Sequence, residues 1–171
     1  MPGLINSHTH LAMTLFRGYG DDMHLMEWLT EKIWPIESKL TPEDCYIGSL
    51  LGCLESIKFG VTSFCDMYFF SDETAKVCQE SGVRGVLSWP IVDEAITNQE
   101  GDPVENAEEF VKRYTGYQLV KPILGPHSIY TCSEETLMRT KEVADRNNVL
   151  MHMHLSETKD EVETSIQKSG E

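Results

Sequence analysis

The chain has 171 residues, a length typical of one domain, and 40% of them are hydrophobic and 9% aromatic, enough for a hydrophobic core. It carries 14 Lys plus Arg against 28 Asp plus Glu, which gives a formal net charge of −14. Because phosphate contacts require clustered basic side chains, this charge argues against nucleic-acid binding. No apolar run approaches the length of a membrane span, so we expect no membrane partner.

The five cysteines are odd in number and include no Cys-x-x-Cys pair. This pattern favours neither a disulfide framework nor a thiolate zinc site, and it indicates a reducing compartment. The N-terminus also lacks the charged-then-apolar order of a secretory signal. We therefore expect a cytoplasmic protein.

Apolar runs of strand length alternate along the chain with segments of helical periodicity. Their Val, Ile and Leu content is typical of parallel strands that are buried on both faces and connected by helices. Residues 1–171 therefore predict one α/β domain of about five βα units. In chain order the predicted strands are Leu4–His10, Thr62–Met67, Arg84–Ile91, Val120–His127 and Val149–Leu155.

A long insertion separates the first two predicted strands. Met26–Ile33 has helical periodicity, and we expect Pro35 to end that helix. Thr41-Pro42-Glu43 offers an N-cap, a proline at the first helical position and an acidic first turn. The helix that begins there is predicted to end at Phe59-Gly60.

Three more helix signals follow. Helices are expected to begin at Ser71 and at Ser133, each capped by its hydroxyl and followed by acidic residues that favour the helix dipole. A last helix is predicted over Lys159–Lys168. The loop Asp93–Val104, rich in Glu, Asn, Gly and Pro, is expected to be the most exposed connection.

Two architectures fit this alternation: an open doubly wound sheet and part of a closed eight-stranded barrel. A doubly wound sheet usually has a glycine-rich phosphate-binding turn after its first strand. Here the first strand leads instead into His8-Thr9-His10-Leu11-Ala12-Met13. We therefore predict an α/β fold of the partial TIM-type (β/α)8 barrel kind, with parallel strands.

Three histidines at predicted strand ends suggest a metal site. His8 and His10 are at positions i and i+2 of one strand, so their side chains share a face with about 7 Å between their Cα atoms. A His-x-His pair also occurs by chance, but His154 ends another strand, and parallel strands bring these ends to one rim. Three neutral imidazoles suit zinc or ferrous iron.

His152 shares a face with His154 and competes for the ligand role. We assign that role to His154, which is closer to the strand end, and expect His152 one layer deeper beside a polar neighbour. Glu157 follows His154 closely enough to move protons over a bound substrate. Its alternative role is to stabilise the N-terminus of the next helix.

Four further polar residues have expected roles. His127 follows Gly125-Pro126, and both substrate contact and loop hydrogen bonding are open for it. Glu37 either binds sugar hydroxyls or is an exposed carboxylate. Asp66 ends the second strand and is expected to hold a ligand histidine or cap a helix. His24 is expected at the surface or on a lid.

These residues resemble the metal-dependent amidohydrolases. Pro2–His10 is similar to the first barrel strand of that family, and the match continues through Met13–Tyr19. The resemblance spans essentially the whole chain. Five more motifs follow in the order seen in the branch that deaminates 5-methylthioadenosine and S-adenosylhomocysteine: Glu27-Trp28-Leu29, Trp34-Pro35-Ile36-Glu37, Asp66-Met67-Tyr68-Phe69, Gly125-Pro126-His127-Ser128 and His154-Leu155-Ser156-Glu157-Thr158.

The resemblance implies that His8, His10 and His154 bind one divalent metal ion, zinc in the first place and iron as the alternative. The reaction it implies is hydrolytic deamination of an adenosine-type nucleoside: 5-methylthioadenosine, S-adenosylhomocysteine or 5′-deoxyadenosine. In that reaction the metal lowers the pKa of a bound water toward about 7, and hydroxide attacks C6 of adenine.

The resemblance also implies roles for three substrate-binding residues. Glu37 and His127 would contact the nucleoside. Glu157 would contact the purine and shuttle a proton, which makes it the catalytic side chain of this part of the barrel. The expected partner is therefore a small nucleoside.

The family adds a histidine from the sixth strand and an aspartate, both ligand and base, from the eighth. We expect both to lie outside residues 1–171, with the later strands and the small β-domain, because a full barrel needs about 250 residues. The 171-residue chain alone is accordingly expected to be inactive or nearly so.

Some relatives hold the amino-acid tail of S-adenosylhomocysteine with arginines near the third strand. Here Ser88-Trp89-Pro90-Ile91 leaves 5-methylthioadenosine, 5′-deoxyadenosine or another adenosine analogue open.

Two other functions remain open. The first is a related amidohydrolase reaction, such as guanine or cytosine deamination or triazine dechlorination. The second is a non-catalytic half-barrel that acts as an assembly module, since two copies could pair their open strand edges as a homo-oligomer.

Overall fold

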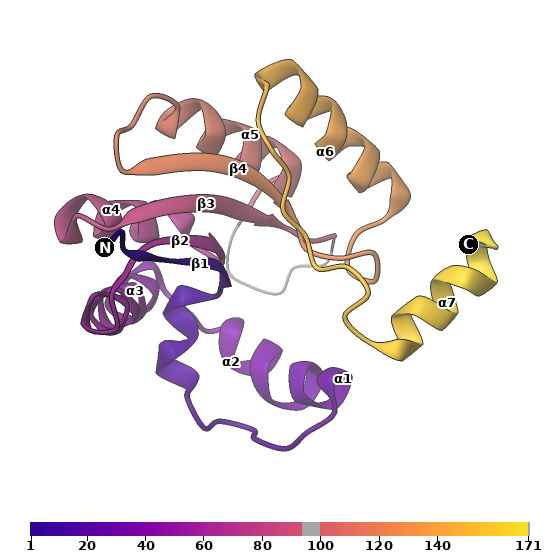
Figure 1. Cartoon of the computed structure of the whole chain (residues 1–171). Coiled ribbons are helices and arrows are strands. Elements are labelled where there is room, and N and C mark those ends of the chain that lie inside the picture. Colours follow the sequence, from indigo (N-terminus) through magenta and orange to yellow (C-terminus); the bar gives the residue numbers. More distant parts are fainter. Residues whose placement is uncertain (94–99, 171) are drawn as a thin grey trace.

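The computed structural model describes residues 1–93 and 100–170, so residues 94–99 of the predicted loop Asp93–Val104 lie outside the described part. One parallel sheet has the strand order β1-β2-β3-β4 (Figure 1). Because this order never reverses, the sheet has the topology of a barrel wall and not of a doubly wound sheet. The predicted fold class is confirmed. The strands are β1 (Leu4–Thr9), β2 (Val61–Met67), β3 (Arg84–Ile91) and β4 (Val120–Pro126).

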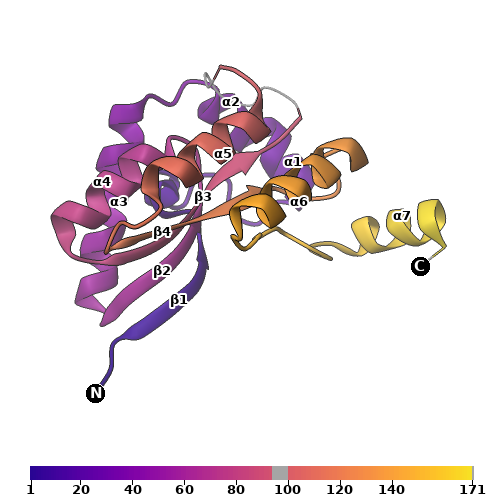
Figure 2. The same cartoon turned by 90° about the horizontal axis from the view of Figure 1, so that it is seen from above.

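Helices α3, α4, α5 and α6 cover one face of the sheet (Figures 1 and 2), whereas α7 projects away from it. Right-handed crossovers place consecutive helices on the same face when strand order does not reverse. The opposite face is therefore the inner face of the barrel wall. The helical segments are η1 (Leu11–Phe16), α1 (Leu25–Trp28), η2 (Leu29–Ile33), α2 (Trp34–Glu37), α3 (Pro42–Lys58), α4 (Ser71–Ser81), α5 (Pro103–Tyr114), α6 (Glu134–Asn147) and α7 (Lys159–Ser169).

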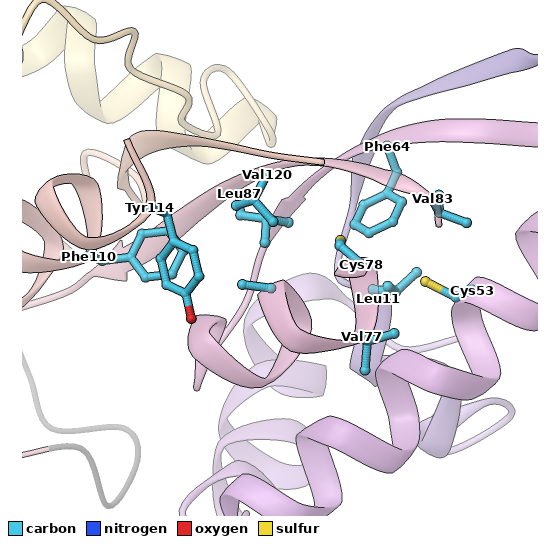
Figure 3. Close-up of a cluster of buried hydrophobic side chains, with 11 residues drawn as sticks. Leu11, Cys53, Phe64, Val77, Cys78, Val83, Leu87, Phe110, Tyr114 and Val120 are labelled. Carbon is cyan, nitrogen blue, oxygen red and sulfur yellow. The ribbon is translucent and has the colours of Figure 1, made fainter. Parts of the chain in front are cut away.

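The largest hydrophobic cluster lies between the helices and the sheet (Figure 3). Phe64 of β2 and Leu87 of β3 are each 1% exposed and pack there with Phe110 of α5. Since successive side chains of a strand point to opposite faces, Cys65 points to the inner face. The core therefore also orients the residues on the opposite face of the sheet.

Most of the predicted helix boundaries are confirmed. Thr41 caps α3 in a reciprocal capping box with Asp44, and the Ser133 hydroxyl caps α6. The predicted hydroxyl cap at Ser71 is wrong. Ser71 is the first residue of α4, and its hydroxyl donates to the carbonyl oxygens of Tyr68 and Ser88 instead.

The prediction that Pro35 ends a helix is also wrong. Helical backbone continues from Leu25 through η2 to Glu37. In η2 the turn is π-helical, and the Trp34 N–H bonds to the Leu29 carbonyl. The wider turn relieves the clash that a proline ring makes with the carbonyl four residues earlier.

The fifth predicted strand, Val149–Leu155, is reduced to one parallel bridge between Leu124 and Met151. The Leu124 N–H donates to the Leu150 carbonyl, and the His152 N–H donates to the Leu124 carbonyl. The next ladder bond would need an N–H at residue 126, which is Pro126 and has none. The segment therefore follows β4 without forming a regular strand.

Gly48 and Gly52 of α3 let η1 approach closely, which fixes the backbone that follows His10. A Cβ at Gly48 would lie 2.5 Å from the Ala12 carbonyl oxygen. The Thr14 hydroxyl donates to the Gly48 carbonyl at 2.9 Å.

Within the described ranges, no helix combines the length and apolarity needed to cross a lipid bilayer.

We predict that Gly48→Ala destabilises the chain, although alanine favours helix, because the added methyl group would push against the Ala12 backbone. Overpacking of this kind costs about 1–3 kcal/mol in the free energy of unfolding. Leu51→Ala, on the exposed side of the same helix, is the control and should change stability by only about 0.5 kcal/mol. Urea unfolding measures both; equal stability of Gly48→Ala and wild type would contradict the packing argument.

Candidate functional site

The structure brings the imidazoles of His8, His10 and His154 together at the carboxyl end of the sheet. His8 is in β1, His10 follows it directly, and His154 comes from the segment that runs beside β4. The Nε2 atom of His154 is 3.2 Å from the Nε2 atoms of both His8 and His10. Three ring nitrogens therefore face one point.

Backbone carbonyls fix the ring protons of two of these histidines. The Nδ1 atom of His10 is 2.6 Å from the Met67 carbonyl oxygen, and the Nδ1 atom of His154 is 2.9 Å from the His127 carbonyl oxygen. A carbonyl only accepts, so each Nδ1 carries a hydrogen, and in the neutral ring each Nε2 then keeps its lone pair. The two Nε2 atoms consequently face each other as acceptors.

The spacing of these nitrogens fits a metal ion. Two nitrogens at about 2.0–2.1 Å from one tetrahedral zinc ion are separated by about 3.3 Å. Without an ion, two lone pairs at 3.2 Å repel. The donor set of three neutral imidazoles thus fits a borderline metal ion such as zinc or ferrous iron.

Burial favours the neutral form of two of these imidazoles, His8 and His10, and ligation requires that form. Burial, followed by the neighbouring imidazoles, lowers the pKa of His8. Burial also lowers the pKa of His10 to about 4, against a smaller opposing effect of its bond to the Met67 carbonyl. Both shifts favour the neutral ring, from which no proton has to be displaced when an ion binds.

His152 lies outside this group of three, as its predicted place one layer deeper requires. Its Nε2 atom is 2.9 Å from Nδ1 of His8, and its Nδ1 atom is 2.8 Å from the sulfur of Cys65. The polar neighbours that the sequence could not name are therefore a thiol and the histidine of β1. Both ring nitrogens of His152 are occupied by these contacts.

Asp66 caps η1, which is one of the two roles expected for it. Its carboxylate accepts from the Leu11 N–H at 2.6 Å, directly after His10. The side chain is 2% exposed, and burial raises its pKa to about 7 against the effect of that hydrogen bond. Asp66 therefore ties the end of β2 to the turn that leaves β1.

Glu37 is buried, contrary to the exposed carboxylate that its local sequence favours. It is 5% exposed and accepts a hydrogen bond from the Tyr68 hydroxyl at 2.8 Å. Burial raises its pKa to about 7, and the Tyr68 bond opposes the rise. The unexpected burial results from the continuous helix through Pro35, which turns Glu37 inward.

Glu157 and His127 complete the polar rim. The Glu157 carboxylate is exposed and accepts from the Tyr130 hydroxyl at 2.8 Å. Glu157 precedes Thr158, which caps α7. The Nδ1 atom of His127 is 2.9 Å from the Thr131 hydroxyl, and burial followed by His154 lowers the pKa of His127 to about 3.

One cavity joins these groups. Its polar lining includes all the predicted site residues except His8, and its apolar wall includes Trp28 and Trp34 of the helical insertion. Among the described residues that line it, none is a Lys or Arg. An anionic molecule would therefore find no basic partner among these lining residues. The polar members named in the sequence analysis are His10, Glu37, His127, His154 and Glu157.

The sequence analysis missed two tyrosines of this cavity, Tyr68 and Tyr130. Each donates its hydroxyl to a carboxylate of the site. The available signal was their position: an aromatic residue with a polar tip just beyond the end of a parallel strand.

A model of the amidohydrolase family matches residues 1–171. A 5′-deoxyadenosine deaminase of Methanothrix thermoacetophila is 54% identical over 166 residues, which cover 97% of this chain and 39% of that protein. A 5-methylthioadenosine/S-adenosylhomocysteine deaminase of Thermodesulfovibrio yellowstonii is 47% identical over 173 residues, or 99% of this chain and 39% of its own length. This chain thus spans about 40% of the length of these relatives.

A solved structure of an adenosine deaminase from Xanthomonas campestris with bound zinc superimposes with a TM-score of 0.93 at 34% identity, covering 100% of this chain and 40% of that one. A guanine deaminase from C. acetobutylicum, 24% identical with a TM-score of 0.85 over 98% of this chain and 43% of its own, shares the fold. On the match of the family model over its whole length, this chain belongs to the amidohydrolase family.

Proposed function

We propose that the protein containing this chain is a metal-dependent deaminase of adenosine-type nucleosides, and that His8, His10 and His154 are metal ligands. The observation that carries the proposal is the convergence of three Nε2 atoms beside a cavity with aromatic walls. The names of the relatives support 5′-deoxyadenosine and 5-methylthioadenosine as substrates. S-adenosylhomocysteine is the third candidate.

Zinc is the proposed ion, with iron as the alternative, because neutral imidazoles favour borderline metals. When bound, such an ion supplies a Lewis acid that lowers the pKa of water toward about 7. In the proposed reaction water replaces the amino group at C6 of the purine, and ammonia and an inosine-type nucleoside are the products. The carbonyl bonds of His10 and His154 hold both rings in the ligating tautomer.

Glu157 is the proposed proton carrier. Its carboxylate lines the cavity with His154, and the Tyr130 hydroxyl restrains it. Glu157 would take one proton from the attacking water and deliver it to a ring nitrogen, which makes C6 electron-poor. The second proton of that water goes to the amino group, which leaves as ammonia.

Glu37 is the proposed contact to the ribose, and His127 is proposed to contact the nucleoside. A buried carboxylate with only one hydrogen-bond partner from the described chain has acceptor capacity left for sugar hydroxyls. This acceptor separates a nucleoside from the free bases and triazines that other members of the fold bind, since those ligands have no ribose. The hydrophobic wall at Trp28 and Trp34 would exclude water from the stacked base.

The complete gene product that carries this chain, loaded with zinc, should release ammonia from 5′-deoxyadenosine or 5-methylthioadenosine. Glu157→Gln should lower kcat by about 10²–10⁴ and leave the zinc content unchanged, because it removes a proton carrier and no ligand. Glu163→Gln, at an exposed carboxylate of α7, is the matched control. Absence of ammonia from every adenosine analogue would sink the proposal, and full activity of Glu157→Gln would remove its assigned role.

Glu37→Gln should weaken binding of adenosine-type nucleosides to the zinc-loaded protein and leave binding of free adenine unchanged. The physical reason is that only the nucleoside offers hydroxyl donors to the carboxylate. Calorimetric titration with the two ligands measures the difference. Equal losses for nucleoside and base would contradict a ribose contact.

The same variant should change stability in a pH-dependent way. The pKa of Glu37 is about 7 in the folded chain, whereas the usual pKa of a glutamate is 4.5. Because the charged carboxylate is buried, the free energy of unfolding falls as the pH rises from 4.5 to 7. Glutamine carries no charge and can still accept from Tyr68. Glu37→Gln should therefore raise the free energy of unfolding of the metal-free protein at pH 8 by on the order of 3 kcal/mol, and by much less at pH 5. A gain of the same size at both pH values would contradict the assigned cause.

A further inference from the structure

His8 differs from the other two proposed ligands in the group that holds its second ring nitrogen. His10 and His154 donate from Nδ1 to backbone carbonyls, which are fixed by the chain. The Nδ1 atom of His8 faces the Nε2 atom of His152 at 2.9 Å. The orientation of His8 thus depends on another side chain that has its own choice of tautomer.

The contact continues one residue further. The Nδ1 atom of His152 lies 2.8 Å from the sulfur of Cys65, which β2 places on the inner face of the sheet. Cys65, His152 and His8 therefore form a continuous series from β2 to the metal site, which we call the Cys65–His152–His8 series.

Counting hydrogens fixes the direction of this series. For His8 to offer a lone pair at Nε2, its hydrogen must be on Nδ1 and must be donated to Nε2 of His152. His152 then carries its own hydrogen on Nδ1 and donates it to the sulfur of Cys65. In the reverse direction the His8 hydrogen would be on Nε2 and would point at the lone pair of His154. His8 could then not bind an ion through Nε2.

We propose that His152 is a positioning residue that selects the metal-binding tautomer of His8, with the Cys65 sulfur as the terminal acceptor. This inference rests on the proposed metal site. It also gives a reason for a polar pair, Cys65 and His152, on the inner face of the sheet. The opposite face of the same strand packs against the hydrophobic core. Residues behind a ligating histidine commonly contribute to metal affinity in this way.

A Cys-His nucleophile is the competing reading of the same pair, and two observations oppose it. Neither side chain is among the described residues that line the cavity of the proposed site. Burial, followed by the charge of Asp66, raises the pKa of the Cys65 thiol to about 11. A thiol that stays protonated and out of the cavity is a poor nucleophile.

The first test compares Zn²⁺ affinity of two variants of the complete gene product by competition with a chelator. His152→Leu removes the acceptor for His8 and should weaken Zn²⁺ binding by about 10–100-fold. His152→Gln keeps an oxygen near the position of Nε2 and should retain most of the wild-type affinity. Equal affinity of His152→Leu and wild type would overturn the inference while leaving the metal site intact. Absence of Zn²⁺ binding by the wild type would remove both.

The second test needs no variant and therefore does not depend on the stability of His152→Leu. Nitrogen-15 NMR of the zinc-loaded wild type distinguishes protonated from unprotonated ring nitrogens. The expected result is a hydrogen on Nδ1 of both His8 and His152. A hydrogen on Nε2 of His152 would make His152 the donor to Nδ1 of His8 and would overturn the inference.

Discussion

The site depends on one constraint: imidazole nitrogens that face each other must all be free of hydrogen. Met67 and His127 impose it on His10 and His154 through backbone carbonyls that can only accept. Burial also favours the neutral ring of His10, since it lowers the pKa of that imidazole to about 4. The resulting cluster of lone pairs is unfavourable alone and favourable around a cation, which is the preorganisation that the proposed metal site requires.

The fold supplies the positions that this constraint requires. The turn after His10 is held from two sides, by the Asp66 carboxylate on the Leu11 N–H and by the close approach of α3 at Gly48. The parallel order of the strands brings the ends of β1, β2 and β4 to one rim. The helical insertion between β1 and β2 then covers this rim with aromatic residues and contributes Glu37.

Much of the fold and of the site geometry was predictable because it follows from local rules. Strand periodicity, caps such as Thr41, and the i, i+2 spacing of His8 and His10 depend on neighbours in the sequence. The burial of Glu37 was not predictable locally, because it depends on a π-helical turn that lets the helix pass Pro35. The fifth predicted strand is not regular because Pro126 of β4 has no N–H to donate to it. That pairing joins two segments that are distant in the sequence, so local patterns could not predict its loss. The partner of His152 was undetermined because Cys65 lies 87 positions away.

The central claim is that His8, His10 and His154 share one divalent ion. Anomalous diffraction at the zinc edge from crystals of the zinc-loaded protein tests it most directly. The account predicts one strong peak at about 2.0–2.1 Å from the Nε2 atoms of all three histidines. A zinc-loaded crystal with no peak between these rings, or with zinc bound only elsewhere, would contradict it.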